Sequence, residues 1–277
     1  MRGLGVRCFA GLSMLAVGCV LAQAQTESGR WTESRANGWY DKQPWLVGAN
    51  YVPSDAINQL EMFQSTTFNP ALNDKELGMA ESIGMNTVRV FLQDQLWTSD
   101  PQGFKQRLGE FLTIAGRHHI RPMLVLFDSC WDPHPRLGPQ HPPIPGVHNS
   151  GWVQSPGKRR LLDPSVESEL KAYVQGVVGA FGKDDRVLAW DVWNEPDNEG
   201  RDSSADVPAK IKRVNELLPQ VFEWARTAHP DQPLTSGVWT GIWDDPTRES
   251  DTVKIQLAES DVISFHDYNW PEGMQAH

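Results

Sequence analysis

The chain has 277 residues, which is enough for one large domain with a substantial core, and its composition is that of a globular protein. Its 35 acidic residues outnumber its 25 lysines and arginines, and the net charge of −10 disfavours nucleic acid and other polyanions as partners. A neutral substrate fits this balance better.

Residues 1–24 have the pattern of a secretory signal peptide. Two arginines precede an apolar stretch, and an A-x-A cleavage site ends at Ala24. The apolar stretch is shorter than the roughly 20 residues that a membrane-spanning helix needs, which argues against a membrane anchor. Lipid attachment at Cys19 is a minor alternative. We therefore expect a secreted or periplasmic protein that is free of the membrane after cleavage and keeps Cys130 as its single cysteine.

A lead-in, residues 25–43, precedes one domain, residues 44–277, in which short apolar runs alternate with helical patterns. Apolar runs predict strands at 46–49, 87–91, 123–127, 188–194, 234–239 and 262–266. Helical patterns predict helices at 73–82, 104–119, 166–181, 210–227 and 254–259, the first of them with Asn73 as its N-cap. Strands that alternate with helices form a parallel sheet, either open or closed into a (β/α)8 barrel.

Two observations decide between these folds. The segment after the first strand, Gly48 to Pro53, has neither a glycine-rich dinucleotide fingerprint nor a P-loop, which favours the barrel over an open nucleotide-binding sheet. A closed barrel needs eight strands, and the six predicted ones leave two further units that would need roughly 60 to 90 more residues. We therefore expect an α/β fold, a TIM barrel that is incomplete, with about six of its eight βα units present.

The carboxyl ends of barrel strands meet at one mouth, so side chains just after the strands should lie close together. The candidates are mostly polar or aromatic: Asn50, Tyr51, Arg89, Asp128, Trp131, Asn194, Glu195, Trp239, Trp243, His266, Asp267 and Tyr268. Pro196 excludes helical geometry for Glu195 and so holds this carboxylate at its strand's end, where it can act as an acid or a base. Arg89 is a lone charge within an apolar strand and must face a carboxylate, in a structural or a catalytic pair.

Tryptophan is abundant, and seven of the 12 fall at or beyond strand ends, where their flat faces suit sugar rings: Trp97, Trp131, Trp152, Trp193, Trp239, Trp243 and Trp270. Trp190 and Trp224 are assigned to the core. The long insertion 129–163 is interpreted as a wall of a binding cleft. Its histidines, His134, His141 and His148, lack the short spacings of zinc ligands, so no metal or cofactor is predicted.

The segment Trp190-Asp191-Val192-Trp193-Asn194-Glu195-Pro196 resembles the fourth-strand signature of the retaining (β/α)8 glycoside hydrolases, the cellulase-like superfamily that includes glycoside hydrolase family 5. Residues 86–91 look like the second-strand arginine motif of that family, and 264–268 look like its sixth-strand His-x-Tyr. Residues 48–53 are similar to secreted bacterial members described as β-xylanase or cellulase-like. Four motifs in the right order make this resemblance, over about residues 45–272, a specific one.

The resemblance implies hydrolysis of O-glycosidic bonds in β-linked polysaccharides or oligosaccharides by a retaining mechanism with two carboxyl groups. It implies Glu195 as the general acid/base, Asn194 as the ligand of the sugar 2-hydroxyl, and Arg89, His266 and Tyr268 around the nucleophile. The remaining residues expected to contact substrate are Asn50, Trp131, Trp239, Trp243 and Trp270. An acid/base of this kind needs a pKa that burial or a neighbouring negative charge raises.

The nucleophile is the part of this mechanism that the sequence does not supply. In the family it is a glutamate at the end of the seventh strand, so we expect it beyond His277. Glu272 follows the sixth strand and is a poor substitute, and the aspartates near the mouth do not match the family position. One alternative function is a carbohydrate-binding barrel without catalysis. Another, a metal-dependent barrel hydrolase, is disfavoured because the first strand lacks His-x-His.

Overall fold

The computed structural model describes residues 29–241 and 247–271, so the predicted signal peptide (residues 1–24), Trp243 and Glu272 lie outside the described residues. Five parallel strands form one sheet in the order of the sequence: β1 (Gly48–Asn50), β2 (Thr87–Phe91), β3 (Arg121–Asp128), β4 (Ala189–Asn194) and β5 (Leu234–Gly237). Every residue of β4 and β5 is buried, as expected for parallel strands that are covered on both faces. The predicted α/β class and parallel sheet are confirmed.

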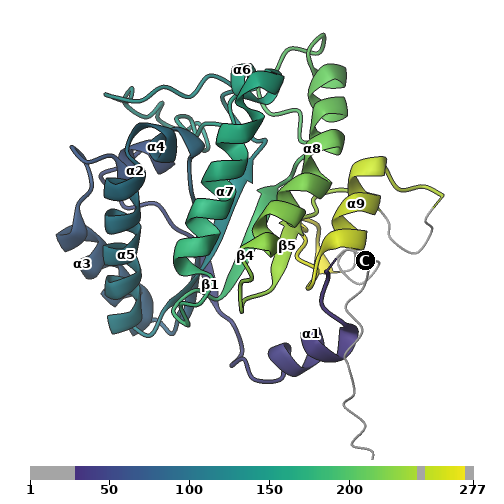
Figure 1. The fold of residues 1–277 in the computed structure, drawn as a ribbon. Helices are drawn as coiled ribbons and strands as arrows, with labels where there is room; N and C mark the ends of the chain where they lie inside the picture. The colour runs from purple at the N-terminus through teal and green to yellow at the C-terminus, as the bar shows by residue number, and fades with distance from the viewer. Residues whose placement is uncertain (1–28, 242–246, 272–277) are drawn as a thin grey trace, which may run out of the picture.

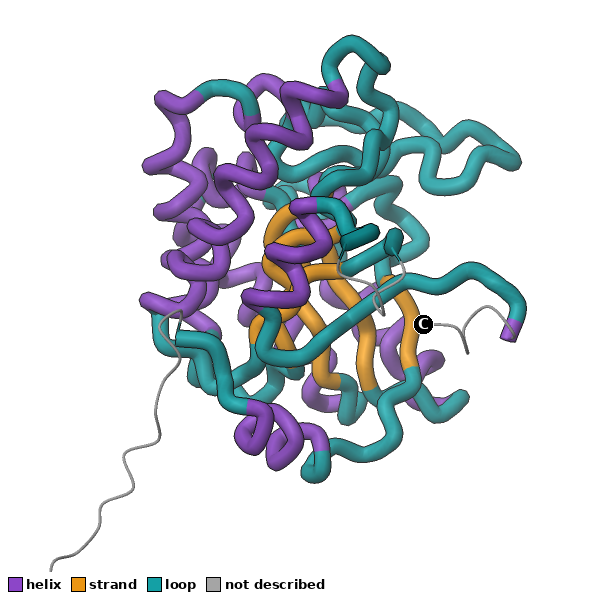
Figure 2. Tube along the Cα trace, turned by 90° about the vertical axis from the view of Figure 1, so that its right-hand side faces the viewer, coloured by secondary structure: helices purple, strands orange, loops and turns teal. Residues whose placement is uncertain are grey.

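The longer helices after β1 connect the strands and pack on one face of the sheet, whereas α1 (Glu33–Tyr40) precedes β1 and lies below the sheet in Figure 1 (Figures 1 and 2). The helices that follow β1 are α2 (Gln59–Phe63), α3 (Pro70–Ser82), α4 (Asp94–Ser99), α5 (Pro101–Arg117), α6 (Lys158–Leu161), α7 (Glu167–Phe181), α8 (Val207–Thr227) and α9 (Asp251–Glu259), with a 3₁₀ turn at Pro164–Val166. The core lies between these helices and the strands, and it contains Trp190 and Trp224, as predicted. No helix within the described ranges is long and apolar enough to cross a membrane.

Helix α3 begins earlier than its sequence predicts. Asn69, not Asn73, is the N-cap, because its side chain accepts a hydrogen bond from the backbone N–H of Leu72 and Pro70 fits the first helical turn. Asn73 lies inside the helix and is buried. The prediction of Asn73 as the cap was therefore wrong by one helical turn.

The predicted strand at 262–266 forms only a single parallel bridge, between Phe265 and Val238 next to β5. Two backbone hydrogen bonds hold this bridge, one from Val238 to Ser264 and one from His266 to Val238. The ladder does not extend further because the Ser264 N–H donates to the Thr235 hydroxyl instead of to a backbone carbonyl. The described sheet thus has five strands where the sequence predicted six, although the bridge still brings His266 to the end of β5.

Candidate active site

Glu195 follows the last residue of β4 in an unusual backbone conformation. Its φ is +43°, in the left-handed region that a residue with a Cβ rarely adopts. The Glu195 N–H donates to the carbonyl of Gly237 at 3.0 Å, which ties the residue to the end of β5. Strained conformations of this kind cluster at functional sites. The backbone therefore holds the Glu195 side chain at the mouth, where the sequence placed it.

Three side chains bind the Glu195 carboxylate. The Nδ1 atom of His266 lies 2.5 Å from Oε1, whereas Oε2 accepts hydrogen bonds from the Cys130 thiol at 3.1 Å and from Nδ2 of Asn198 at 2.6 Å. Burial raises the pKa of the Cys130 thiol, and the charges of Asp128 and Glu195 add to this effect, so the thiol stays protonated and donates. The carboxylate is therefore fixed from two sides by groups on three different loops.

These contacts set the ionisation of Glu195. Burial raises its pKa, but the hydrogen bonds from His266 and Cys130, the charge of His266 and the hydrogen bond from Asn198 together outweigh burial. The net result is a Glu195 pKa below the ordinary value. The prediction of a raised Glu195 pKa is therefore wrong for the site formed by the described residues. These residues favour the ionised carboxylate.

A network of polar side chains adjoins this carboxylate. Arg89 forms an ion pair with Asp191, whose side chain is fully buried, and Nη2 of Arg89 also donates to Oδ1 of Asn194 at 2.8 Å. The amide of Asn194 then donates to Oδ1 of Asp128 at 2.7 Å. Burial raises the pKa of Asp128 to about 6 against the opposing hydrogen bonds from Asn194 and Cys130. Arg89 thus faces a carboxylate, as predicted, and this network fixes the Asn194 amide beside Glu195.

Gly237 lets β5 approach this network of polar side chains closely. A Cβ atom at this position would lie 3.0 Å from Nε2 of His266 and 3.1 Å from Nη2 of Arg89. The Gly237 carbonyl accepts hydrogen bonds from the Glu195 backbone and from the Gln256 side chain, both at 3.0 Å. The absence of a side chain at the last residue of β5 therefore leaves room for both Arg89 and His266.

A buried lysine connects the two loops that carry Cys130 and Glu195. Nζ of Lys210, on α8, lies 2.7 Å from Oδ2 of Asp202 and donates to the carbonyl of Ser129 at 2.8 Å. The Gln154 side chain donates to the same Asp202 oxygen at 2.9 Å. Because an unpaired buried charge is costly, this pair fixes the loop after β3 relative to the loop after β4.

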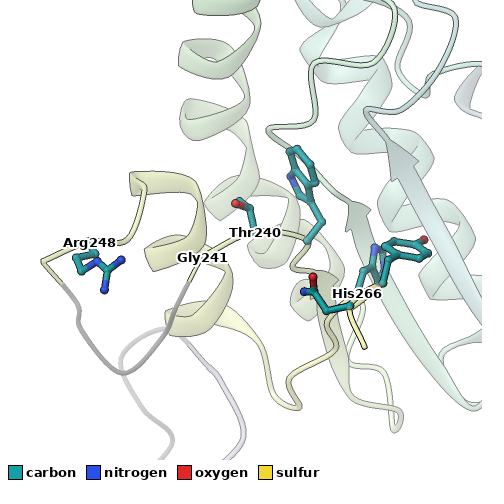
Figure 3. Close-up of a pocket in the computed structure, with 7 residues that line it drawn as sticks. Thr240, Gly241, Arg248 and His266 are labelled. Atoms are coloured by element: carbon teal, nitrogen blue, oxygen red, sulfur yellow. The ribbon is translucent and has the colours of Figure 1, made fainter. Parts of the chain in front are cut away.

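An open pocket of about 530 Å³ adjoins His266 (Figure 3). Trp239, which is 39% exposed, and Tyr268, which is 91% exposed, line it with Thr240, Gly241, Arg248 and Asn269. The indole N–H of Trp239 donates to Oδ1 of Asp197 at 2.7 Å, which orients the ring. Figure 3 shows Arg248 on the opposite side of this pocket from His266. A partly exposed indole beside a carboxylate is suited to a sugar ring.

Comparison with known proteins identifies the chain. Residues 49–277 match the model of one family, "Cellulase (glycosyl hydrolase family 5)". The chain belongs to glycosyl hydrolase family 5. A search of curated proteins found no match.

Solved structures agree with the fold of this family 5 chain. The β-1,4-D-mannanase from Cryptopygus antarcticus is 16% identical, with a TM-score of 0.54, and the match covers 82% of this chain and 68% of that one. The exo-β-1,4-mannosidase from Opitutaceae bacterium strain TAV5 is 21% identical, with a TM-score of 0.53 and coverage of 80% and 38%. The GH5_18 protein from Streptomyces cattleya, solved with GlcNAc, is 17% identical, with a TM-score of 0.50 and coverage of 71% and 45%. The family 5 chain thus has a (β/α)8-barrel type of fold and spans less than half the length of the last two proteins.

The structure brings most of the predicted site residues of the family 5 chain together, although their roles stay predictions. Asn50, at the exposed end of β1, lies in register with Arg89. Trp131 is half-buried and its ring meets His148 edge-on at 5.4 Å. Trp270 is 83% exposed and does not line the pocket beside His266.

Three residues predicted at the mouth lie elsewhere. Tyr51 points outward, where its hydroxyl donates to Asn73 and Glu76, because side chains alternate along a strand. Trp193 is buried in the core, and Trp97 packs on α7, where a Cβ added to Gly176 would meet its ring. Trp152, in contrast, lies at a strand end: it is half-buried, with its ring 5.0 Å from that of Phe91, the last residue of β2.

Sequence reasoning missed two partners of Glu195. Asn198 lies three residues further on, in the turn that follows Pro196, where a short amide side chain reaches back to the strand end. Cys130 was recognised only as a free thiol, and the structure shows it buried and bonded to the carboxylate. The described residues contain no cluster of three His, Cys, Asp or Glu side chains that could hold a metal ion.

The Cys130 contact is open to a direct test. We expect Cys130→Ala to raise the pKa of the Glu195 carboxyl, because the thiol donates to the ionised form and stabilises it. Cys130→Ser, which keeps a donor, should titrate close to the parent chain. Carbon-13 NMR titration of the Glu195 carboxyl in the three chains measures the effect. A midpoint for Cys130→Ala equal to or below that of the parent would contradict this assignment of the donor.

Proposed function

We propose that the protein is a secreted retaining glycoside hydrolase that cleaves β-linked glycans, with Glu195 as its general acid/base. The observation that carries this proposal is the Glu195 carboxylate itself, held by three donors at the strand mouth beside the pocket that Trp239 lines. Membership of family 5 supports the reaction class, and the signal-like residues 1–24 support export.

We infer that the substrate is a carbohydrate with β-1,4-linked sugars. Two of the similar solved structures are described as a β-1,4-D-mannanase and an exo-β-1,4-mannosidase, and a third was solved with GlcNAc. The acidic balance of this chain also suits a neutral glycan better than a polyanion. A β-1,4-mannan is therefore the first substrate to assay, followed by cellulose and xylan.

The proposed mechanism needs a second carboxylate at about 5 to 5.5 Å from Glu195. The two buried carboxylates of the site are both engaged, Asp191 by Arg89 and Asp128 by Asn194. We propose that the nucleophile belongs to a later unit of the barrel, outside the described residues. A negative charge placed there would raise the pKa of Glu195 and so supply the protonated acid that the described contacts alone disfavour.

Expression of two chains tests this function. We expect the 277-residue chain to release no reducing sugar from β-1,4-mannan, cellulose or xylan, because the buried carboxylates described near Glu195 are both engaged. A chain extended through two more βα units should hydrolyse one of these glycans. Reducing-sugar release measures the outcome. Efficient hydrolysis by the 277-residue chain would show that its nucleophile lies within the present sequence.

A non-catalytic carbohydrate-binding barrel is the second candidate. It is favoured by the lowered pKa of Glu195: burial raises this pKa, but the hydrogen bonds from His266 and Cys130 lower it by more. The two functions differ in one measurement on the extended chain. Binding of an oligosaccharide that quenches tryptophan fluorescence, with no product after long incubation, would favour the binding function over hydrolysis.

A further inference from the structure

A second pocket, of about 250 Å³, lies outside the candidate active site, where the insertion after β3 packs against α4 and α6. Its lining includes Arg136, Arg159, Arg160, His134 and the amide of Gln95, and the rest is two prolines and a glycine. No carboxylate is among these lining residues. A cationic pocket of this kind is unexpected in a chain with a net charge of −10.

The wall of this pocket is built by close contacts. A Cβ on Gly157 would lie 2.3 Å from the Pro135 ring, so only glycine lets the two segments come together here. The Lys158 N–H donates to the carbonyl of Pro133 at 2.9 Å, and the Gln95 side chain donates to the carbonyl of Pro135 at 3.2 Å. The backbone that carries the arginines is therefore held in place by packing and hydrogen bonds.

The arginines of the pocket differ in how far their charge is neutralised. Nε of Arg160 lies 2.6 Å from the buried carboxylate of Asp94, and its Nη1 lies 3.0 Å from Glu169. Within the described parts of the chain, neither Arg136 nor Arg159 has an ion-pair partner. Asp163 accepts hydrogen bonds from Ser165 and forms no ion pair with Arg159, although the charge of Arg159 adds to the Ser165 hydrogen bonds in lowering the pKa of Asp163. Arg136 and Arg159 thus line the pocket as exposed guanidinium groups with no carboxylate in ion-pair contact.

We propose that this pocket binds an oxyanion, a carboxylate or a sulfate, between Arg136 and Arg159. A guanidinium group presents a planar fork of N–H donors that matches such groups and forms charge-assisted bonds with them. The Gln95 amide and His134 add neutral or cationic polar groups at the same wall. The oxyanion is carried by an acidic sugar unit or is a free inorganic anion. Glu195 does not line this pocket, so the test of the oxyanion site is independent of the proposed hydrolysis.

Three small probes test the site with the 277-residue chain. Methyl β-glucuronide and methyl β-glucoside differ only in a carboxylate against a hydroxymethyl group, and sodium sulfate carries the oxyanion without a sugar. Ligand-observed NMR measures binding of the two sugars, and sulfate is assayed as a competitor of the glucuronide and by titration of arginine side-chain resonances. The variants are Arg136→Gln and Arg159→Gln, with Lys75→Gln on the exposed face of α3 as the charge-matched control. Circular dichroism melting verifies that each chain is folded.

We expect the glucuronide to bind and the glucoside not to bind, with either arginine variant weakening the glucuronide at least about tenfold and Lys75→Gln changing it less than about twofold. Displacement of the glucuronide by sulfate would place both oxyanions at one site. Sulfate binding that needs both arginines, without glucuronide binding, would support the site and identify its ligand as a free anion. Binding of neither probe, or an equal loss in Lys75→Gln, would overturn the proposal.

Discussion

In an extended, hydrolytically active chain, Glu195→Gln is expected to lower kcat/KM by about 10² to 10⁴-fold, the usual contribution of general acid and base catalysis. The amide fills the space of the carboxylate but can neither give a proton to the leaving oxygen nor take one from water. The loss should be largest for substrates with poor leaving groups, which need protonation most. Steady-state rates on an aryl glycoside with a good leaving group and on the natural glycan measure this difference.

Glu223→Gln is the matched control for this experiment. It removes one carboxylate from the exposed face of α8, away from the site, and should leave kcat/KM unchanged. A Glu195→Gln chain that keeps more than about a tenth of the parent rate on the poor substrate would assign the acid/base role to another residue.

Arg89→Met should lower the free energy of unfolding by about 3 to 5 kcal/mol, because it leaves the fully buried carboxylate of Asp191 without its cation. The same change removes the hydrogen bond of 2.8 Å that Nη2 of Arg89 donates to Oδ1 of Asn194, so the activity of an extended chain should fall as well. Urea unfolding followed by circular dichroism measures the stability of the 277-residue chain and of its variant.

Two further variants separate charge from packing. Arg117→Met breaks an ion pair with Asp74 in which both side chains are about half exposed, and should cost about 0 to 1 kcal/mol. Adding Asp191→Asn to Arg89→Met should recover part of the loss, because the amide keeps the acceptor oxygen that Trp193 and Gly237 use and carries no charge. Equal losses in Arg89→Met and Arg117→Met would contradict a buried, charge-dependent pair.

The sequence was sufficient for those parts of the fold that follow from simple physical constraints. Parallel strands in a covered sheet are rich in apolar residues, so β2 was predicted at its observed bounds and β4 at its observed end. The cost of an unpaired buried guanidinium predicted that Arg89 faces a carboxylate. Neither inference needed knowledge of the loops.

The errors have physical reasons too. The direction of a side chain alternates along a strand, so Asn50 lies at the mouth and Tyr51, one residue later, faces the helices. A tryptophan at a strand end fits the core and the mouth equally well by sequence, and Trp193 is in the core. The contact between Cys130 and Glu195 joins residues 65 positions apart across two loops, and no local pattern encodes it.

The backbone of Glu195 has a thermodynamic consequence of its own. A non-glycine residue at φ +43° costs of order 1 to 3 kcal/mol, a cost that glycine or asparagine would largely avoid. The described residues contain four other non-glycine positions with positive φ, but only at Glu195 does this conformation present a carboxylate that accepts three side-chain hydrogen bonds. A chain that needed only a sugar-stacking surface would gain nothing from a carboxylate held there, so the local cost at Glu195 fits the catalytic proposal better than the binding one.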